Sequence, residues 1–510
     1  MSTPSERTLV GQPTHAGAGA PAAAPVGLGK HYLRYSSATI LTTLAGLISF
    51  PALTRLLDNT QFGILGYYDT WLMMAVTIIK LGGQHAILRM YPFGADGERL
   101  THFTTNLVFL PMMVSVGLWL IGVTGLSIAA AAGVLNVQPV FWGAVILLPM
   151  LVFTSQVEMT LRVSERSGLL TLSRITWRWL ELVLIVGVVA LFQRSALAVY
   201  VGKVASALIL VAFYAFWVSR NLKFSRSMID WGTYRRSLRY SLPLVVNEIA
   251  AVSMISIDRI MLRHQTGDYA AVGVFTIGCA LAMQISTIMS DPLWNAFNPV
   301  INRVHGTDGA AEVRALKSKV LLPVTYACIG IGAGIWAVGP DVLTMLAGAD
   351  KSTSGPVFAW LGAMFAMLPL LDVTGYGLLL HHRSVTVLVL TGLAALLNIG
   401  LNLVWIPVFG VMGAVYATVV AYAALSLGRC IMCPRELLQL PNARTLATAV
   451  GAAALFILVL RTTDVFGISA PWLRTIVSGL VWLATFLVPA VLLDPRLRRL
   501  LIERGRSAAA

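Results

Sequence analysis

Charged residues are scarce in this chain of 510 residues. Only 12% are Asp, Glu, Lys or Arg, whereas 57% are hydrophobic and the mean hydropathy is +0.78. Soluble domains carry about 25% charged residues because their surfaces face water. Half that share leaves too little polar surface for several soluble domains. Most of the surface is therefore expected to face lipid.

Catalytic and nucleotide-binding signatures are also missing. The sequence contains no P-loop, H-E-x-x-H, G-x-S-x-G or protein-kinase motif. ATP-driven transport by this chain alone is thus disfavoured, and no catalytic residue, cofactor or metal is expected. The segments between the apolar runs are short, which argues against a membrane enzyme with a large catalytic loop.

Acidic residues and cysteines are few. The 22 acidic residues are outnumbered by 37 lysines and arginines, which gives a net charge of +15. Nucleic acid is not an expected partner, because the basic residues lie in short clusters between apolar runs, as the positive-inside rule requires. Cys430 and Cys433 form a C-x-x-C without a second pair of ligands, so we interpret them as apolar packing residues.

Apolar runs long enough to cross a membrane recur along the chain. A spanning helix needs about 20 mostly apolar residues, and we predict an all-α polytopic protein with about fourteen such helices. Their ranges are 36–54, 67–88, 103–129, 138–160, 170–192, 196–219, 238–260, 270–292, 318–339, 355–379, 384–406, 410–433, 443–462 and 470–493.

The basic residues orient these helices. With the N-terminus in the cytoplasm, 28 of the 37 lysines and arginines fall on the cytoplasmic side and 7 on the outer side. A bias that persists through successive loops supports the topology, because omission of one span would reverse every later loop. Both termini are therefore predicted to be cytoplasmic, in a multi-pass protein of the bacterial inner membrane.

An internal repeat divides the first twelve spans into two halves. Residues 54–65 align weakly with residues 258–275, which matches Arg55 with Arg259 and Gly63 with Gly273. Six-span repeats have the same orientation and are related by an axis along the membrane normal. The predicted division is a disordered cytoplasmic tail (1–30), an N-terminal six-helix lobe (31–220), a cytoplasmic linker (221–237), a C-terminal six-helix lobe (238–435), two additional helices (436–493) and a basic cytoplasmic tail (494–510).

Three segments resemble a known family. Residues 240–250 (Y-S-L-P-L-V-V-N-E-I-A), 256–262 (S-I-D-R-I-M-L) and 271–277 (A-V-G-V-F-T-I) resemble the seventh and eighth helices of Wzx-type polysaccharide flippases. Residues 397–418, with an Asn-rich helix, a Pro and a Gly turn, resemble the same family, which belongs to the multidrug/oligosaccharidyl-lipid/polysaccharide exporter superfamily. The resemblance implies a MATE-like fold.

The resemblance also implies a substrate. This is an oligosaccharide on undecaprenyl pyrophosphate, moved to the outer leaflet by alternating access for O-antigen, capsule or exopolysaccharide export. Expected partners are membrane lipids, a polysaccharide polymerase and a chain-length regulator, and H⁺ or Na⁺ is expected to drive transport. A pyrophosphate crosses hydrocarbon only when paired with buried cations, which agrees with this interpretation.

Ionisable residues inside the spans are candidates for that role. Asp69 and Lys80 are eleven residues apart, which places them on one helical face about 16 Å apart, and Glu248 and Arg259 repeat this spacing. The predicted substrate-binding residues are Lys80, Arg178, Lys203, Asn247 and Arg259. The predicted ion-coupling residues are Asp69, Glu181, Glu248, Asp291 and Asp372.

Simpler alternatives exist for several of these residues. Lys203 has no acid three or four residues away, which favours anion binding, but it could instead extend to the membrane surface. Arg259 could do the same, and Asp291, before Pro292, could simply end its span. At the level of the whole protein, the alternatives are a cation-coupled drug or metabolite exporter of the same fold and a membrane-embedded glycosyl-transfer enzyme.

Overall fold

The computed structural model describes residues 28–94, 96–134, 138–381, 383–463, 467–468 and 470–499, with residues 28–40 described by their backbone alone. Most of the two predicted tails, 1–30 and 494–510, lies outside these residues. All regular elements within the described residues are helical. The predicted fold class, an all-α membrane protein, is therefore confirmed.

Within the described residues, eight α-helices precede the linker between the lobes. They are α1 (Leu28–Leu56), α2 (Asn59–Ile79), α3 (Gly83–Met90), α4 (Gly97–Thr104), α5 (Leu110–Ala131), α6 (Pro139–Val163), α7 (Ser167–Leu191) and α8 (Ala196–Asn221). A π-helical turn, Thr105–Phe109, joins α4 to α5 into one long span.

The second half begins with α9 (Trp231–Thr266), α10 (Tyr269–Thr307) and α11 (Ala310–Ala347). It continues with α12 (Gly355–Gly375), α13 (Ser384–Phe409), α14 (Val411–Met432) and α15 (Ala443–Thr462). The last span consists of α16 (Pro471–Trp482), a π-helical turn (Leu483–Leu487) and α17 (Val488–Leu493).

Twelve spans in the described residues are long and apolar enough to cross a membrane. The two other predicted spans correspond to α1, of which Leu41–Leu56 is a shorter apolar helix, and to α7. Arg174, Arg178 and Glu181 give α7 three charged residues within one span length, more than a typical spanning helix carries. The predicted number of about fourteen is thus close, and these two helices account for the difference.

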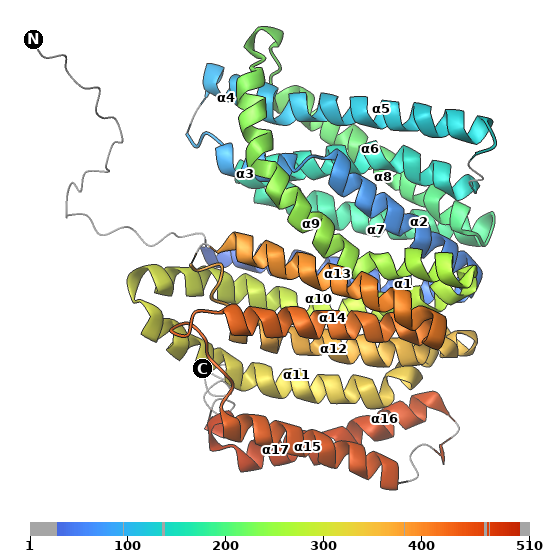
Figure 1. The fold of residues 1–510 in the computed structure, drawn as a ribbon, viewed down its shortest axis with the longest axis vertical. Helices are drawn as coiled ribbons and strands as arrows, with labels where there is room; N and C mark the ends of the chain where they lie inside the picture. The colour runs from blue at the N-terminus through green and yellow to red at the C-terminus, as the bar shows by residue number, and fades with distance from the viewer. Residues whose placement is uncertain are drawn as a thin grey trace, which may run out of the picture.

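The helices lie side by side in two lobes with an added pair at one end (Figure 1). The helices α2 to α8 occupy one end of the long axis, α10 to α14 lie in the middle, and α15 to α17 lie at the other end. The added pair packs on α11. There the indole of Trp482 donates a hydrogen bond to the carbonyl of Gly330, at 3.0 Å.

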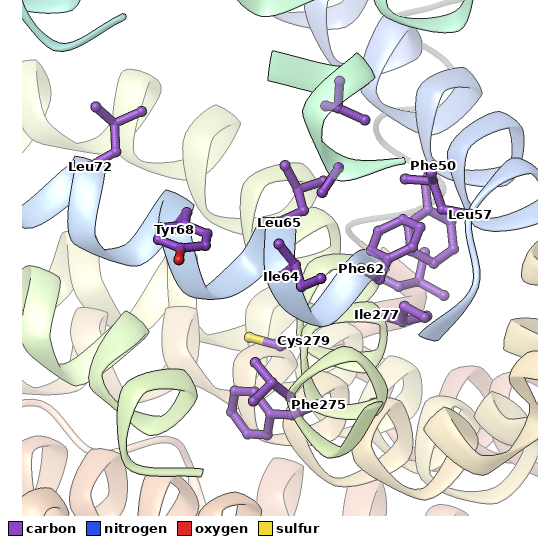
Figure 2. Close-up of a cluster of buried hydrophobic side chains, with 14 of the residues drawn as sticks. Phe50, Leu57, Phe62, Ile64, Leu65, Tyr68, Leu72, Phe275, Ile277 and Cys279 are labelled. Carbon is purple, nitrogen blue, oxygen red and sulfur yellow. The ribbon is translucent and has the colours of Figure 1, made fainter. Parts of the chain in front are cut away.

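A buried apolar cluster joins α1 and α2 to α10 (Figure 2). Phe62, Leu65 and Leu72 of α2 belong to it together with Phe275 and Ile277 of α10, and each of them is at most 7% exposed. The predicted repeat thus brings corresponding helices of the two halves into direct contact.

Two glycines allow this contact. A Cβ atom on Gly63 would lie 1.7 Å from the carbonyl oxygen of Tyr269, and one on Gly273 would lie 1.8 Å from that of Asn59. Each glycine therefore contacts the residue that lies four positions before the other glycine in the sequence, Tyr269 before Gly273 and Asn59 before Gly63. This reciprocity is the geometry of residues at a two-fold axis, and Gly63 and Gly273 are the pair that the sequence repeat aligned.

The predicted span 67–88 is interrupted in the structure. The helix α2 begins earlier, at Asn59, and ends at Ile79, and α3 follows after a turn. In this turn Leu81 and Gly82 adopt positive φ angles of 49° and 69°. A left-handed leucine is unfavourable, and hydropathy alone did not predict the break. The Gly82–Gly83 pair was the available signal.

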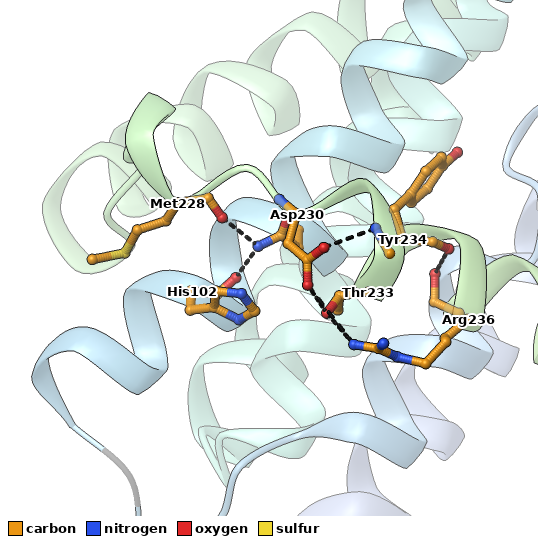
Figure 3. A network of polar contacts seen from close by, with 9 residues as sticks. His102, Met228, Asp230, Thr233, Tyr234 and Arg236 are labelled. Carbon is orange, nitrogen blue, oxygen red and sulfur yellow. Dashed lines mark hydrogen bonds and ion pairs between the residues drawn. The ribbon is translucent and has the colours of Figure 1, made fainter.

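The linker between the lobes is held by a polar network (Figure 3). The Asn106 amide donates to the carbonyls of His102 and Met228, at 2.9 and 2.8 Å, and its oxygen accepts from the Asp230 N–H, at 2.7 Å. Asp230 in turn caps α9 by accepting from the Gly232 N–H. The start of α9 is therefore fixed against the first lobe.

Candidate functional site

A cavity of about 280 Å³ lies between α1, α2, α7, α8 and α10. We call it the central cavity. Elements of both lobes form it, because α10 contributes one wall. Its polar side chains are Ser49, Asp69, Arg178, Glu181, Lys203, Thr276 and Gln284. Four of the ten predicted site residues, Asp69, Arg178, Glu181 and Lys203, are thus brought together.

Lys203 and Asp69 form an ion pair across the central cavity. The Lys203 Nζ lies 2.7 and 2.8 Å from the two carboxylate oxygens of Asp69. The Tyr200 hydroxyl donates a third hydrogen bond to Asp69, at 2.8 Å. Lys203 has no acid near it on its own helix, α8, and its carboxylate partner comes from α2.

Arg178 and Glu181 form a second pair, within α7. Their Nη1 and Oε2 atoms are 2.7 Å apart, and the side chain of Glu181 is 11% exposed against 41% for Arg178. The arginine is therefore the more exposed member of the pair, and both residues line the cavity. With the Asp69–Lys203 pair, the lining holds two cations and two carboxylates.

Arg259 lies behind the cavity wall. It is 8% exposed, its Nε donates to the Thr276 hydroxyl at 3.3 Å, and its Nη1 donates to the Ile255 carbonyl at 3.1 Å. Within the described residues it forms no ion pair. The alternative in which Arg259 extends to the surface is therefore wrong, because the guanidinium is buried beside a cavity-lining threonine.

Lys80 and Glu248 form an ion pair outside the central cavity, between α2 and α9. The Gln84 amide also donates to Glu248, at 3.0 Å, and the His85 Nε2 lies 3.6 Å from it. These contacts join the turn at the end of α2 to the second lobe. Asn247 precedes Glu248 on α9, and its Oδ1 is buried without a partner in the described residues.

Asp372 and Asp291 lie elsewhere in the second lobe. Asp372 of α12 accepts from the Nη1 of Arg429 at 2.9 Å, on the wall of a different cavity. Asp291 is an exposed residue of α10. The helix continues through Pro292 and Pro299 to Thr307, so Asp291 does not end the helix. Neither carboxylate contacts the central cavity.

Asp258 was not predicted, although the structure makes it the centre of a buried polar cluster. Its side chain is 0% exposed and accepts from Asn402 at 2.7 Å, Thr418 at 2.9 Å and Asn398 at 3.3 Å. The Asn402 Oδ1 is buried without a partner among the described residues. The spacing of the two asparagines, four residues apart on α13, was the available signal.

These features define a class: a two-lobed membrane carrier with ionisable residues around an internal cavity. Residues 28–305 match the family described as polysaccharide biosynthesis protein. The chain belongs to this family. A search of curated proteins returned no match.

Solved structures share the fold. The lipid II flippase MurJ in an inward closed conformation has 11% sequence identity and a TM-score of 0.72, and the alignment covers 91% of this chain and 99% of that one. An inward-facing multidrug resistance MATE family transporter of the MOP superfamily has 16% identity and a TM-score of 0.56, covering 78% and 96% of the two chains. The MATE multidrug transporter DinF-BH has 17% identity and a TM-score of 0.56, covering 80% and 95%. The fold is therefore that of flippases and transporters.

Proposed function

We propose that this protein moves an undecaprenyl-pyrophosphate-linked oligosaccharide from the cytoplasmic to the outer leaflet of the bacterial inner membrane by alternating access. The family supports a role in polysaccharide biosynthesis, and the fold supports transport. The observation that carries the proposal is the pair of cations, Arg178 and Lys203, on the central cavity.

These cations suit a pyrophosphate. An unpaired charge inside a membrane is costly, so each cation is bound to a carboxylate when no substrate is present. A pyrophosphate carries enough negative charge to replace Asp69 at Lys203 and Glu181 at Arg178. The released carboxylates then have to be protonated or find other donors, and Tyr200 already supplies one to Asp69.

A site for cationic drugs would be built differently. Such a site needs carboxylates that are not neutralised, whereas both acids on the central cavity are bound to cations. Arg259, close behind the wall, adds further positive potential. The central cavity thus favours an anionic substrate over a cationic drug. We assign none of its polar side chains to glycosyl transfer.

The proposal places ion coupling at Asp258. A fully buried carboxylate without an ion pair is unstable unless it takes up a proton or a cation. The amide nitrogens of Asn398 and Asn402 and the hydroxyl of Thr418 donate to Asp258. The same side chains also carry oxygens, which are the ligands that a hard cation such as Na⁺ prefers. Replacement of Asp258 by Asn should make transport insensitive to Na⁺ at fixed pH, whereas a pH dependence should persist because Asp69 and Glu181 are released when the substrate binds.

The membrane context follows the same proposal. Both termini are placed in the cytoplasm, in agreement with the distribution of lysine and arginine, and the transported glycan is passed to a polysaccharide polymerase with its chain-length regulator. Single cysteines introduced at the exposed positions Lys223 and Asp350, in a variant without the native cysteines, test the orientation. We expect a membrane-impermeant thiol reagent to label only the second in intact cells.

Export in a deletion strain tests the function. Lys203→Ala and Arg178→Ala should abolish or strongly reduce restoration of surface polysaccharide, because each removes a cavity cation. Lys223→Ala, at an exposed linker residue, is the matched control and should restore export fully. If the two cavity variants restored export but lost dye efflux, the drug-exporter alternative would replace this proposal.

A further inference from the structure

A second cavity lies in the other lobe, between α10, α12, α13 and α14. Its volume is about 290 Å³, and we call it the distal cavity. Its lining includes Trp294, Asn298, Asp372, Tyr376, Val387 and Arg429.

The polar groups of the distal cavity have unused hydrogen-bonding capacity. The Nη1 of Arg429 and the Oδ1 of Asp372 bind each other, at 2.9 Å, and the other atoms of these two groups have no further side-chain partner in the described residues. The Oδ1 of Asn298 is buried and has no partner there either. Donors and acceptors are therefore available side by side.

The aromatic side chains add an apolar surface. The rings of Trp294 and Tyr376 lie 5.3 Å apart and are tilted by 44°, and Phe297 packs against both. A ring face next to groups that donate and accept hydrogen bonds suits a pyranose, which has an apolar face and a rim of hydroxyls.

The charge of the distal cavity excludes other ligands. The Asp372 carboxylate and the Arg429 guanidinium cancel, so the site lacks the excess negative charge that a cation needs and the excess positive charge that a pyrophosphate needs. A neutral sugar requires neither. The central cavity differs because Arg259, which has no ion pair in the described residues, lies behind its two ion pairs and adds a positive charge.

The helix α10 connects the two cavities. Gln284 lines the central cavity and Asn298 lines the distal one. These residues are about 21 Å apart along an ideal helix and within about 40° of one face. That separation is several times the width of one sugar ring. A glycan attached to a pyrophosphate in the central cavity reaches the distal cavity only with several sugars.

We propose that the distal cavity binds a sugar near the free end of the lipid-linked oligosaccharide, so that the carrier distinguishes complete from incomplete glycans. This inference rests on the proposed function. Trp294 and Tyr376 contact the sugar ring, and Asp372, Arg429 and Asn298 bind its hydroxyls.

Binding to the purified protein tests this proposal. The probes are lipid-linked glycans extracted from the producing bacterium and fractionated by number of sugars, together with undecaprenyl pyrophosphate without sugar. For the wild type, affinity should rise with glycan length. Trp294→Ala and Asp372→Asn should weaken binding of the longest glycan about tenfold and leave binding of the sugar-free lipid unchanged, whereas Trp294→Phe should retain most of the affinity.

Controls separate the outcomes. Lys203→Ala should weaken binding of every lipid, and Trp472→Ala, on an exposed residue of α16, should change none. The distal-site proposal is overturned if affinity is independent of glycan length, or if Trp294→Ala weakens the sugar-free lipid equally. If the released, lipid-free oligosaccharide binds as tightly as the lipid-linked form, the pyrophosphate site in the central cavity, and with it the proposed function, is overturned. If no lipid binds at all, the proposed function itself fails.

Discussion

The contact between α2 and α10 makes a quantitative prediction about Gly63. A Cβ at this position would lie 1.7 Å from the backbone oxygen of Tyr269. Carbon and oxygen approach no closer than about 3.3 Å, so Gly63→Ala forces the two helices apart by roughly 1.6 Å. Overpacking of a core typically costs about 1–3 kcal/mol. Because the backbone cannot turn away as a side chain can, we expect a cost of about 3 kcal/mol, at the upper end of this range.

Thermal unfolding of the purified protein in detergent, followed by tryptophan fluorescence, measures this cost. Gly273→Ala should destabilise the protein equally, and the double variant should lose less than the sum, because helices already separated accept the second Cβ more easily. Gly187→Ala is the matched control, since open space surrounds this helical glycine. A Gly63→Ala protein as stable as Gly187→Ala would refute the reasoning.

Three further predictions concern charged residues. Lys317→Met should destabilise the protein by about 1–3 kcal/mol, because the buried Nζ donates to two backbone carbonyls; Lys319→Met, at an exposed position, should have little effect in the same thermal assay. Lys80→Glu should lower the thermal stability, because it places two carboxylates side by side, and the double variant Lys80→Glu with Glu248→Lys should recover it. A double variant that is no more stable than either single variant contradicts the ion pair. Burial alone would raise the pKa of Asp494, but backbone and hydroxyl hydrogen bonds outweigh burial and lower it. The ionised Asp494 therefore stabilises the fold fully above the unfolded pKa of about 3.9, and this stabilisation is lost as the pH falls through the lower folded pKa. Asp494→Asn should make the thermal stability fall less steeply as the pH is lowered through this range. An unchanged pH dependence of the thermal stability contradicts this.

The membrane fold was accessible from sequence because it depends on local hydropathy. Long apolar runs and the bias of lysine and arginine require no knowledge of which helices touch. The repeat went further, since it aligned Gly63 with Gly273, and these residues meet in space. The same reasoning failed at the turn after Ile79, where a leucine with positive φ interrupts an otherwise apolar run.

The site was less accessible because its partners lie on different helices. Helical periodicity showed that Lys203 had no acid on its own helix, but it could not show that Asp69 of α2 lies beside it. Similarly, Asp258 and the two asparagines of α13 stood in separate motifs, 140 and 144 residues apart, and only folding joins them. Pairs within one helix, such as Arg178 and Glu181, are the contacts that sequence spacing can reach.

Translocation by the purified protein tests the central proposal most directly. Proteoliposomes containing the protein and lipid-linked glycans from the producing bacterium are mixed with a membrane-impermeant enzyme that cleaves the glycan. The wild type should expose nearly all of the glycan to cleavage over time, and Lys203→Ala should expose only the half already in the outer leaflet. If wild-type vesicles stop at that half, the protein does not move this substrate, and the proposed function is wrong.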